Sequence, residues 1–144
     1  MKKILKAFLA LACVTALAAC GSKKQDTAAV EIDYGTSELY TREDMDEAIK
    51  LIQEEFSKWE GCELHSIAYT SDDDCNEDNI AWMNQLEAEG DAKETFTQCI
   101  QFKSNFHSPK EGGGAWNPDQ EYTDWGWWLA RADGGKWKLM TWGY

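Results

Sequence analysis

The sequence predicts an α+β domain in which a long N-terminal helix packs on a curved antiparallel sheet, with a short second helix. Three observations predict it. An apolar face with helical spacing begins at residue 45, apolar and polar residues alternate in three segments after residue 94, and a Gly-Gly pair separates the last two of these. This single domain is assigned to residues 39–144.

The first helix begins at a capping box, in which Thr41 supplies the N-cap hydroxyl and Asp44 the acid three residues later. Gly61 is expected to end the helix. Apolar residues recur between them at spacings of three and four, which places them on one face: Met45, Ile49, Ile52, Phe56 and Trp59.

A strand over 62–70, a turn over 71–74 and a second helix follow. Asp74 and Glu77 have the spacing of a second capping box, and the helix is expected to end near Gly90. Its apolar residues are Ile80, Trp82, Met83 and Leu86.

The remaining chain is predicted to be sheet. The alternation over 95–106 puts Phe96, Ile100, Phe102 and Phe106 on one face, and Cys99 with its polar neighbours on the other. A Gly- and Pro-rich loop over 108–121 precedes strands over 122–132 and 136–144.

The last two strands are predicted to form a hairpin. If Gly134 and Gly135 are its turn residues, three pairs share one face: Trp125 with Tyr144, Trp127 with Trp142, and Leu129 with Met140. The other face then carries Trp128, Ala130, Ala132, Trp137 and Leu139. Both faces are apolar, so both are covered or one is a binding surface.

The first 19 residues have the pattern of an export signal. Lys2, Lys3 and Lys6 precede a short apolar run that is below the roughly 20 residues of a spanning helix. Residues 17–20, Leu-Ala-Ala-Cys, resemble the lipobox of bacterial lipoproteins. The resemblance implies that the Cys20 thiol receives a diacylglyceryl group, that the signal is cleaved before Cys20, that palmitate is part of the lipid anchor, and that the protein lies on the extracytoplasmic side of the cell membrane.

Residues 20–38 are interpreted as the lipidated Cys20 and a flexible tether. Val30, Ile32 and Tyr34 alternate with polar residues, so a short strand there is the alternative. Removing residues 1–19 leaves 11 basic and 26 acidic side chains, a net charge of −15. This charge argues against binding nucleic acid or adsorbing electrostatically to anionic membranes. Membrane attachment is therefore expected through the lipid alone.

The predicted order of elements resembles the cystatin-like and NTF2-like α+β folds, and residues 132–143 are similar to the last hairpin of many small exported proteins of that type. Together with the lipobox and the stretch 59–62, Trp-Glu-Gly-Cys, the chain resembles a group of small bacterial lipoproteins of uncharacterised function. NTF2-like enzymes often use an Asp, His or Tyr deep in the cone. No position here matches such a residue, so no catalytic residue is predicted.

Three cysteines remain besides Cys13 of the signal and Cys20: Cys62, Cys75 and Cys99. An exported location permits one disulfide, while a regular strand over 62–70 separates Cys62 from Cys75 too far for a bridge. Two alternatives therefore remain: a disulfide between Cys99 and either Cys62 or Cys75, or three free thiols. A reactive thiol paired with His65 or His107 has no support from the spacing.

The acidic run 72–78 does not form a calcium loop, because Glu77 and Met83 occupy positions that need Gly and Glu. It is interpreted as a turn and a helix N-terminus, and neither a metal nor a cofactor is predicted. Asp119, Glu121 and Asp124 are chance candidates for an acid pair of the kind that cleaves glycosides.

The aromatic residues supply the candidate binding surface. Trp125, Trp127, Trp142 and Tyr144 could form a platform for a glycan or another ligand, with Trp116 on the loop as its lid; the alternative is that they form the core. The expected function is a non-catalytic module that binds a small molecule, a glycan or an envelope protein on the concave face of the sheet. A small enzyme and a structural envelope component are the alternatives.

Overall fold

The structure is a computed structural model that describes residues 29–91 and 94–144. The predicted signal over 1–19, Cys20 and the first part of the tether lie outside these residues. The elements, in chain order, are β1 (Glu31–Asp33), α1 (Arg42–Phe56), β2 (Glu63–Tyr69), a short 3₁₀ helix (Asp72–Asp74), α2 (Glu77–Ala88), β3 (Gln98–His107), β4 (Glu121–Arg131) and β5 (Lys138–Gly143).

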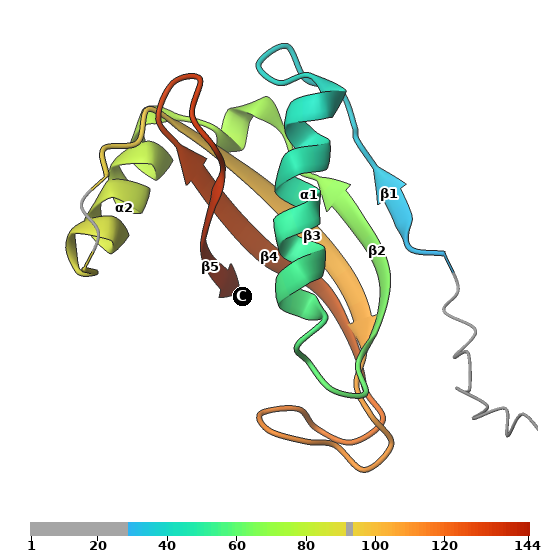
Figure 1. Ribbon diagram of the computed structural model, residues 1–144. Helices are drawn as coiled ribbons and strands as arrows, with labels where there is room; N and C mark the ends of the chain where they lie inside the picture. Colours follow the sequence, from blue (N-terminus) through green and yellow to red (C-terminus); the bar gives the residue numbers. More distant parts are fainter. Residues whose placement is uncertain (1–28, 92–93) are drawn as a thin grey trace, which may run out of the picture.

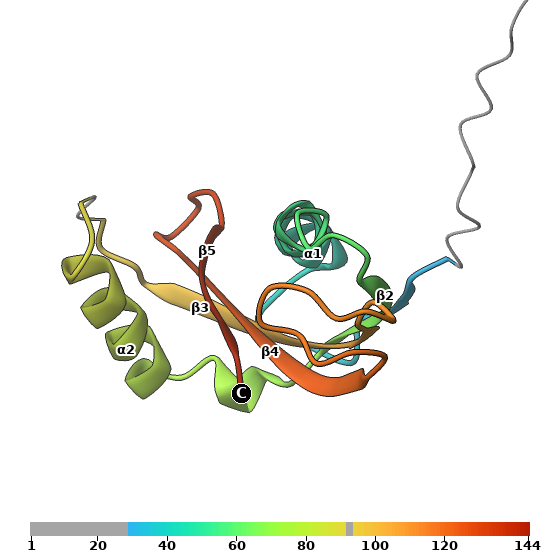
Figure 2. The same ribbon diagram turned by 90° about the horizontal axis from the view of Figure 1, so that it is seen from below.

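The five strands form one open sheet in the order β1-β2-β3-β4-β5. All neighbouring pairs are antiparallel except β1 and β2, which run parallel. The sheet bends around α1, which lies across one face, while α2 lies beside the end of the sheet where β3 begins (Figures 1 and 2). The predicted α+β class, with a helix packed on a curved sheet, is therefore confirmed.

The prediction of a long N-terminal helix and a purely antiparallel sheet is wrong in two respects. The strand β1 precedes α1, and its parallel pairing with β2, with Ile32 opposite Ile67, makes the sheet mixed. β1 falls within 20–38, the range assigned to the tether, where the alternation of Val30, Ile32 and Tyr34 indicated it. These three side chains pack against the core.

The predicted capping box at the start of α1 is confirmed. The Thr41 hydroxyl accepts a hydrogen bond from the Asp44 N–H at 3.2 Å, and the Asp44 carboxylate accepts one from the Thr41 N–H at 2.9 Å. The helix ends at Phe56 rather than at Gly61, and Gly61 lies with φ +75° in the turn before β2. Trp59 packs on Phe56 from this turn at 4.9 Å.

The main core lies between α1 and the sheet. It joins α1 to inward-facing residues of β2, β3 and β4, together with one residue just before α1 and one just before β5: Tyr40, Met45, Ala48, Ile49, Ile52, Phe56, Ile67, Tyr69, Ile100, Phe102, Phe106, Trp127, Leu129 and Trp137. A second cluster on the opposite face joins α2 to the sheet through Met83, Phe96, Cys99 and Ala130. Phe96 was predicted to share a face with Ile100, but it precedes β3, so the alternation of the strand does not include it.

The hairpin register is confirmed far from the turn and wrong near it. Trp127 lies opposite Trp142 as predicted, but a bulge after Trp128 places Leu129 opposite Leu139 instead of Met140. Leu139 and Trp137 therefore pack in the main core, and Met140 packs on the second cluster. The turn is also displaced by one residue, since the Gly135 N–H donates to the Ala132 carbonyl at 2.8 Å and Gly134 has φ +67°.

The second predicted capping box is wrong, because Asn76 rather than Asp74 is the N-cap of α2 and accepts from the Asn79 N–H at 3.0 Å. Asn84 fastens α2 to the segment before β3 through two hydrogen bonds with the backbone of Phe96. Near the end of α2, the buried Glu87 carboxylate pairs with Lys138 of β5 at 2.6 Å. These contacts hold α2 against one end of the sheet only.

Candidate functional site

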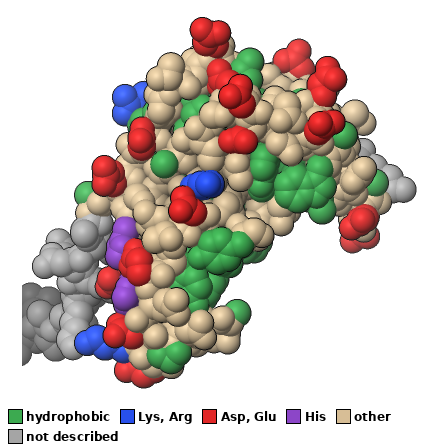
Figure 3. All heavy atoms as spheres, turned by 180° about the vertical axis from the view of Figure 1, so that it is seen from behind, with side chains coloured by type: hydrophobic (Ala, Val, Ile, Leu, Met, Phe, Trp, Pro, Cys, Tyr) green, Lys and Arg blue, Asp and Glu red, His purple; other side chains and the backbone are tan. Residues whose placement is uncertain are grey.

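An open groove of about 480 Å³ lies on the sheet face opposite α1. Its floor consists of residues that face one another across three strands: Gln101 opposite Trp128 and Lys103 opposite Gly126, with Thr141 and Gly143 following on β5. The groove exists because α1 covers the other face and α2 covers only one end of this one. Figure 3 shows hydrophobic side chains on this face around a hollow, beside which a basic and an acidic side chain lie.

Aromatic side chains form the walls of the groove. Trp82 of α2 packs edge-on against Trp128 of β4 at 5.4 Å and keeps 37% of its surface exposed. Trp142 and Tyr144, at the end of the edge strand β5, also line the groove and are 41% and 85% exposed, but their rings pack on Trp127 at 5.9 Å and on Trp125 at 5.0 Å, on the α1 side. Trp82 and Trp128 are therefore the aromatic side chains that belong to this face, and aromatic surface beside an open groove indicates a binding surface.

Two glycines in the floor of the groove leave space there because they have no side chain. Gly126 and Gly143 lie opposite each other, and a Cβ atom on Gly126 would be 3.0 Å from the Gly143 carbonyl oxygen. Such a contact is tighter than van der Waals packing normally allows, so a larger residue at position 126 would push the strands apart. The absence of side chains here leaves a flat surface between Trp128 and the end of β5.

The polar groups of the groove are few and accessible. Lys103 and Asp124 face each other with Nζ and Oδ1 3.9 Å apart, and both side chains are largely exposed. The Gln101 amide and the Thr141 hydroxyl also line the groove and supply both donors and acceptors. Asp124 is the one carboxylate among the lining residues, so the groove has no acid pair for glycoside hydrolysis.

The structure brings the predicted aromatic platform together on the α1 side of the sheet, where it belongs to the core and its margin. Trp127 is fully buried in the main core. Trp116 and Trp125 also lie on the α1 side, where they pack against Trp59 at 4.9 and 6.0 Å. Trp142 lies opposite Trp127 and Tyr144 packs on Trp125, so these two share that side and line the groove only from the edge strand β5.

Two groove residues, Trp82 and Trp128, were not predicted as ligand-binding residues. The alternation of the last two strands already placed Trp128 on the opposite face from Trp127, which was a signal for it. Nothing in the sequence indicated that α2 would leave Trp82 at the margin of that face. The loop over 108–120 does not cover the groove, because Trp116 packs on Phe106 at 5.2 Å in the core on the other side.

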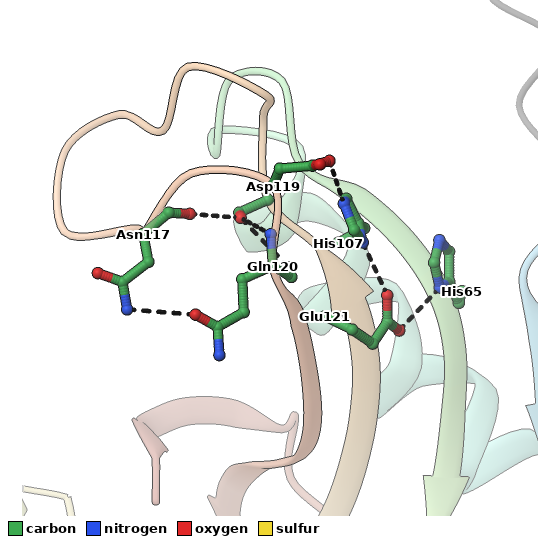
Figure 4. Close-up of polar contacts among 7 residues, drawn as sticks. His65, His107, Asn117, Asp119, Gln120 and Glu121 are labelled. Atoms are coloured by element: carbon green, nitrogen blue, oxygen red, sulfur yellow. Dashed lines mark hydrogen bonds and ion pairs between the residues drawn. The ribbon is translucent and has the colours of Figure 1, made fainter.

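A separate polar cluster joins β2, β3 and β4 (Figure 4). Glu121 accepts hydrogen bonds from both histidines, at 3.0 Å from His65 Nδ1 and 3.0 Å from His107 Nδ1. His107 Nε2 lies 3.0 Å from Asp119. Since carboxylates only accept, His107 must donate from both nitrogens, which requires the imidazolium form. The hydrogen bond with Asp119, and then that with Glu121, raises the pKa of His107 accordingly.

This cluster anchors the loop over 108–120 to the sheet. The Ser108 hydroxyl donates to the Asn117 carbonyl at 2.6 Å and accepts from the Gln120 N–H at 2.9 Å, which closes the loop beside Asp119 (Figure 4). The histidines have no cysteine partner among their hydrogen bonds in the described residues. Nor does any group of three or more His, Cys, Asp or Glu side chains there have an arrangement that could hold a metal ion.

The acidic run after β2 has a structural role. Asp72 accepts hydrogen bonds from the Tyr69 hydroxyl at 2.6 Å and from the Glu38 N–H at 2.7 Å, so it ties the segment before α1 to the end of β2. Burial alone would raise the pKa of Asp72, but a hydrogen bond from the Ser37 hydroxyl, and then those from Tyr69 and Glu38, hold the pKa below its usual value.

No helix within the described ranges is both long and apolar enough to cross a membrane. The chain matches no family model, and comparison with the curated proteins and with the solved structures finds no similar protein.

Proposed function

We propose that the protein is a lipid-anchored extracytoplasmic binding module whose groove opposite α1 holds a neutral carbohydrate chain, without catalysing a reaction. The observation that carries the proposal is the groove itself, with Trp82 and Trp128 beside a flat glycine floor and Trp142 and Tyr144 at its β5 edge. We further propose that the domain is a variant of the cystatin-like or NTF2-like folds in which the helix fills the concave face. Ligand binding is then assigned to the opposite face.

The chemistry of the groove favours a sugar over other ligands. A pyranose ring presents C–H groups on its faces and hydroxyls around its rim. Flat aromatic rings pack against the C–H groups on the faces of the sugar. The Gln101 amide, the Thr141 hydroxyl and Asp124 can form hydrogen bonds with the hydroxyls at its rim. The groove is open along the sheet, which suits a chain better than an enclosed small molecule.

Charge favours a neutral ligand. The chain after residue 19 carries a net charge of −15, and the one cation among the groove residues, Lys103, already faces Asp124. An anionic glycan would be repelled over long range and would find no unpaired cation in the groove. The absence of a second carboxylate in the groove supports binding rather than hydrolysis.

The anchor would place this groove near the membrane surface. If Cys20 is lipidated, the 11 residue steps to Glu31 would reach roughly 18 Å as a flexible coil. Two or more acyl chains would hold the protein on the membrane, because one chain binds only marginally.

The binding proposal is tested by calorimetric titration of the full chain in a detergent whose head group is not a sugar. The ligands are gluco-, manno-, xylo- and chito-oligosaccharides. Trp128→Ala and Trp82→Ala should weaken binding by at least about tenfold, equivalent to about 1.4 kcal/mol. Trp116→Ala is the matched control, because Trp116 lies on the opposite face and should leave affinity unchanged. Equal losses in all three variants, or no heat with any sugar, would contradict the proposal.

The anchor is tested separately by growing cells with a labelled palmitate analogue. The wild-type protein should carry the label and sediment with membranes, and Cys20→Ser should do neither. A labelled Cys20→Ser protein would show that the anchor is assigned to the wrong residue. Neither outcome depends on whether the groove binds sugar.

A further inference from the structure

Three thiols are free in the described part of the chain: those of Cys62, Cys75 and Cys99. Their positions on the sheet leave one feasible pair. Cys62 directly precedes β2, whereas Cys75 lies beside Tyr69 at the other end of this strand, which is roughly 20 Å long. β3 runs antiparallel to β2, with Tyr69 opposite Phe102, so Cys99 lies beyond the same end of β2 as Cys75.

Cys75 and Cys99 lie against each other at this end of the sheet. Cys75 packs on the second cluster, of which the buried Cys99 is a member. The Cys99 thiol donates to the carbonyl oxygen of Asp74, the residue before Cys75, at 3.8 Å. The Cys75 thiol donates to the Ser71 carbonyl at 3.6 Å, in the same turn as Asp74. The backbone is held at both residues, because the Tyr40 hydroxyl donates to the Cys99 carbonyl at 2.7 Å and the Cys75 N–H donates to the Asp72 carbonyl at 3.0 Å. The Tyr69 hydroxyl also contacts Cys75 Sγ at 3.5 Å.

We propose that Cys75 and Cys99 are a disulfide site that joins the start of α2 to β3. Cys75 directly precedes Asn76, the N-cap of α2, so the bridge would fix this helix to the sheet at its N-terminal end. Lys138 and Glu87 already fasten its C-terminal end. The bridge would thus hold Trp82 at the margin of the groove, although its formation does not depend on what the groove binds.

The chemistry is thiol–disulfide exchange with an oxidant that contains a disulfide. The Cys75 thiolate attacks one sulfur of the oxidant, forms a mixed disulfide and releases one thiol. The Cys99 thiolate then attacks the Cys75 sulfur, which closes the bridge and releases the second thiol. The two cysteine protons leave with these two thiols, so two cysteines are oxidised and one disulfide is reduced.

The order of attack follows from the environments of the two sulfurs. The hydrogen bond with Cys99 lowers the pKa of Cys75, while contact with Cys75 and burial raise the pKa of Cys99. Cys75 is also the more exposed of the two. It is therefore the thiol that reacts first with an external disulfide.

The test is peptide mapping of the full chain after incubation with glutathione disulfide and alkylation of the remaining thiols. Cleavage after acidic residues separates the three cysteines, because Glu63 and Asp74 lie between Cys62 and Cys75, and Glu77 lies between Cys75 and Cys99. A crosslinked peptide pair containing Cys75 and Cys99, with Cys62 alkylated, is expected. The oxidised protein should also melt about 10 °C higher than the reduced protein, since the bridge closes a loop of roughly 25 residues.

Cys62→Ser is the matched control and should retain both the crosslink and the shift in melting temperature. Cys75→Ser should lose both. Full alkylation of Cys75 and Cys99 in the treated wild-type protein would overturn the proposal, as would glutathione persisting on Cys75 or a bridge to Cys62. The mapping of the wild-type chain decides the matter even if a cysteine variant fails to fold.

Discussion

Trp127 donates its indole N–H to the Ser104 hydroxyl at 2.8 Å, and both side chains are buried between α1 and the sheet. This bond satisfies the one polar atom of the largest side chain in the core. The neighbouring Trp125 differs, because its indole nitrogen is buried without a partner among the described residues. The two residues face the same side of β4, so position along the strand decides which indole finds an acceptor.

Removing the Trp127 ring should destabilise the domain far more than removing an exposed tryptophan. Trp127→Ala is expected to cost about 3–5 kcal/mol in the free energy of unfolding, because it leaves a large cavity in the core. Trp142→Ala, at the margin of the sheet, should cost about 1 kcal/mol. Urea unfolding followed by circular dichroism measures both. Equal costs would mean that Trp127 is not a core residue.

The hydrogen bond itself can be isolated with a double-mutant cycle. Ser104→Ala should cost about 1–3 kcal/mol, because it leaves the Trp127 N–H buried without an acceptor. In a Trp127→Phe background, which has no N–H, the same change should cost clearly less. The coupling between the two substitutions is read from urea unfolding of the four proteins. A coupling near zero would exclude a stabilising role for the bond.

His107 should make stability depend on pH near neutrality. Its hydrogen bonds with Asp119 and Glu121 raise its pKa above the ordinary value of 6.5. The resulting stabilisation is present below pH 6.5 and is lost as the pH rises through the raised pKa. Melting temperatures between pH 5.5 and 8.5 should therefore fall for the wild-type protein, and the fall should be smaller for His107→Gln. Identical slopes would show that another group causes the change.

Asp124 has φ +56°, at the point where β4 bulges opposite Asn105. Its N–H donates to the Asn105 side chain at 3.0 Å rather than to a strand neighbour. Asp124→Val should cost about 1–2 kcal/mol, because a β-branched residue resists the left-handed conformation.

Asp124→Gly is the matched comparison for that substitution. It should stay within about 1 kcal/mol of the wild-type stability, since it relieves strain while losing an exposed ion pair with Lys103. If Val proves as stable as Gly in urea unfolding, strain at position 124 is not significant.

Local sequence was sufficient for most of the elements. The capping box at Thr41, the apolar face of α1, the strand before the acidic run and the hairpin all follow from spacings within one segment, because caps and periodicity are local properties. The register in the part of the hairpin far from its turn, with Trp127 opposite Trp142, was predictable for the same reason.

Only the tertiary structure decided which faces are covered. The bulge after Trp128 moves Leu139 into the main core and Met140 out of it, and a one-residue shift of this kind exchanges the faces of a strand. The parallel pairing of β1 with β2 joins segments far apart in the chain. Likewise, the groove between Trp82 and Trp128, and the contact of Cys75 with Cys99, arise from where α2 packs. The sequence alone determined which residues are apolar and how they repeat, whereas long-range packing determined which of them remain exposed.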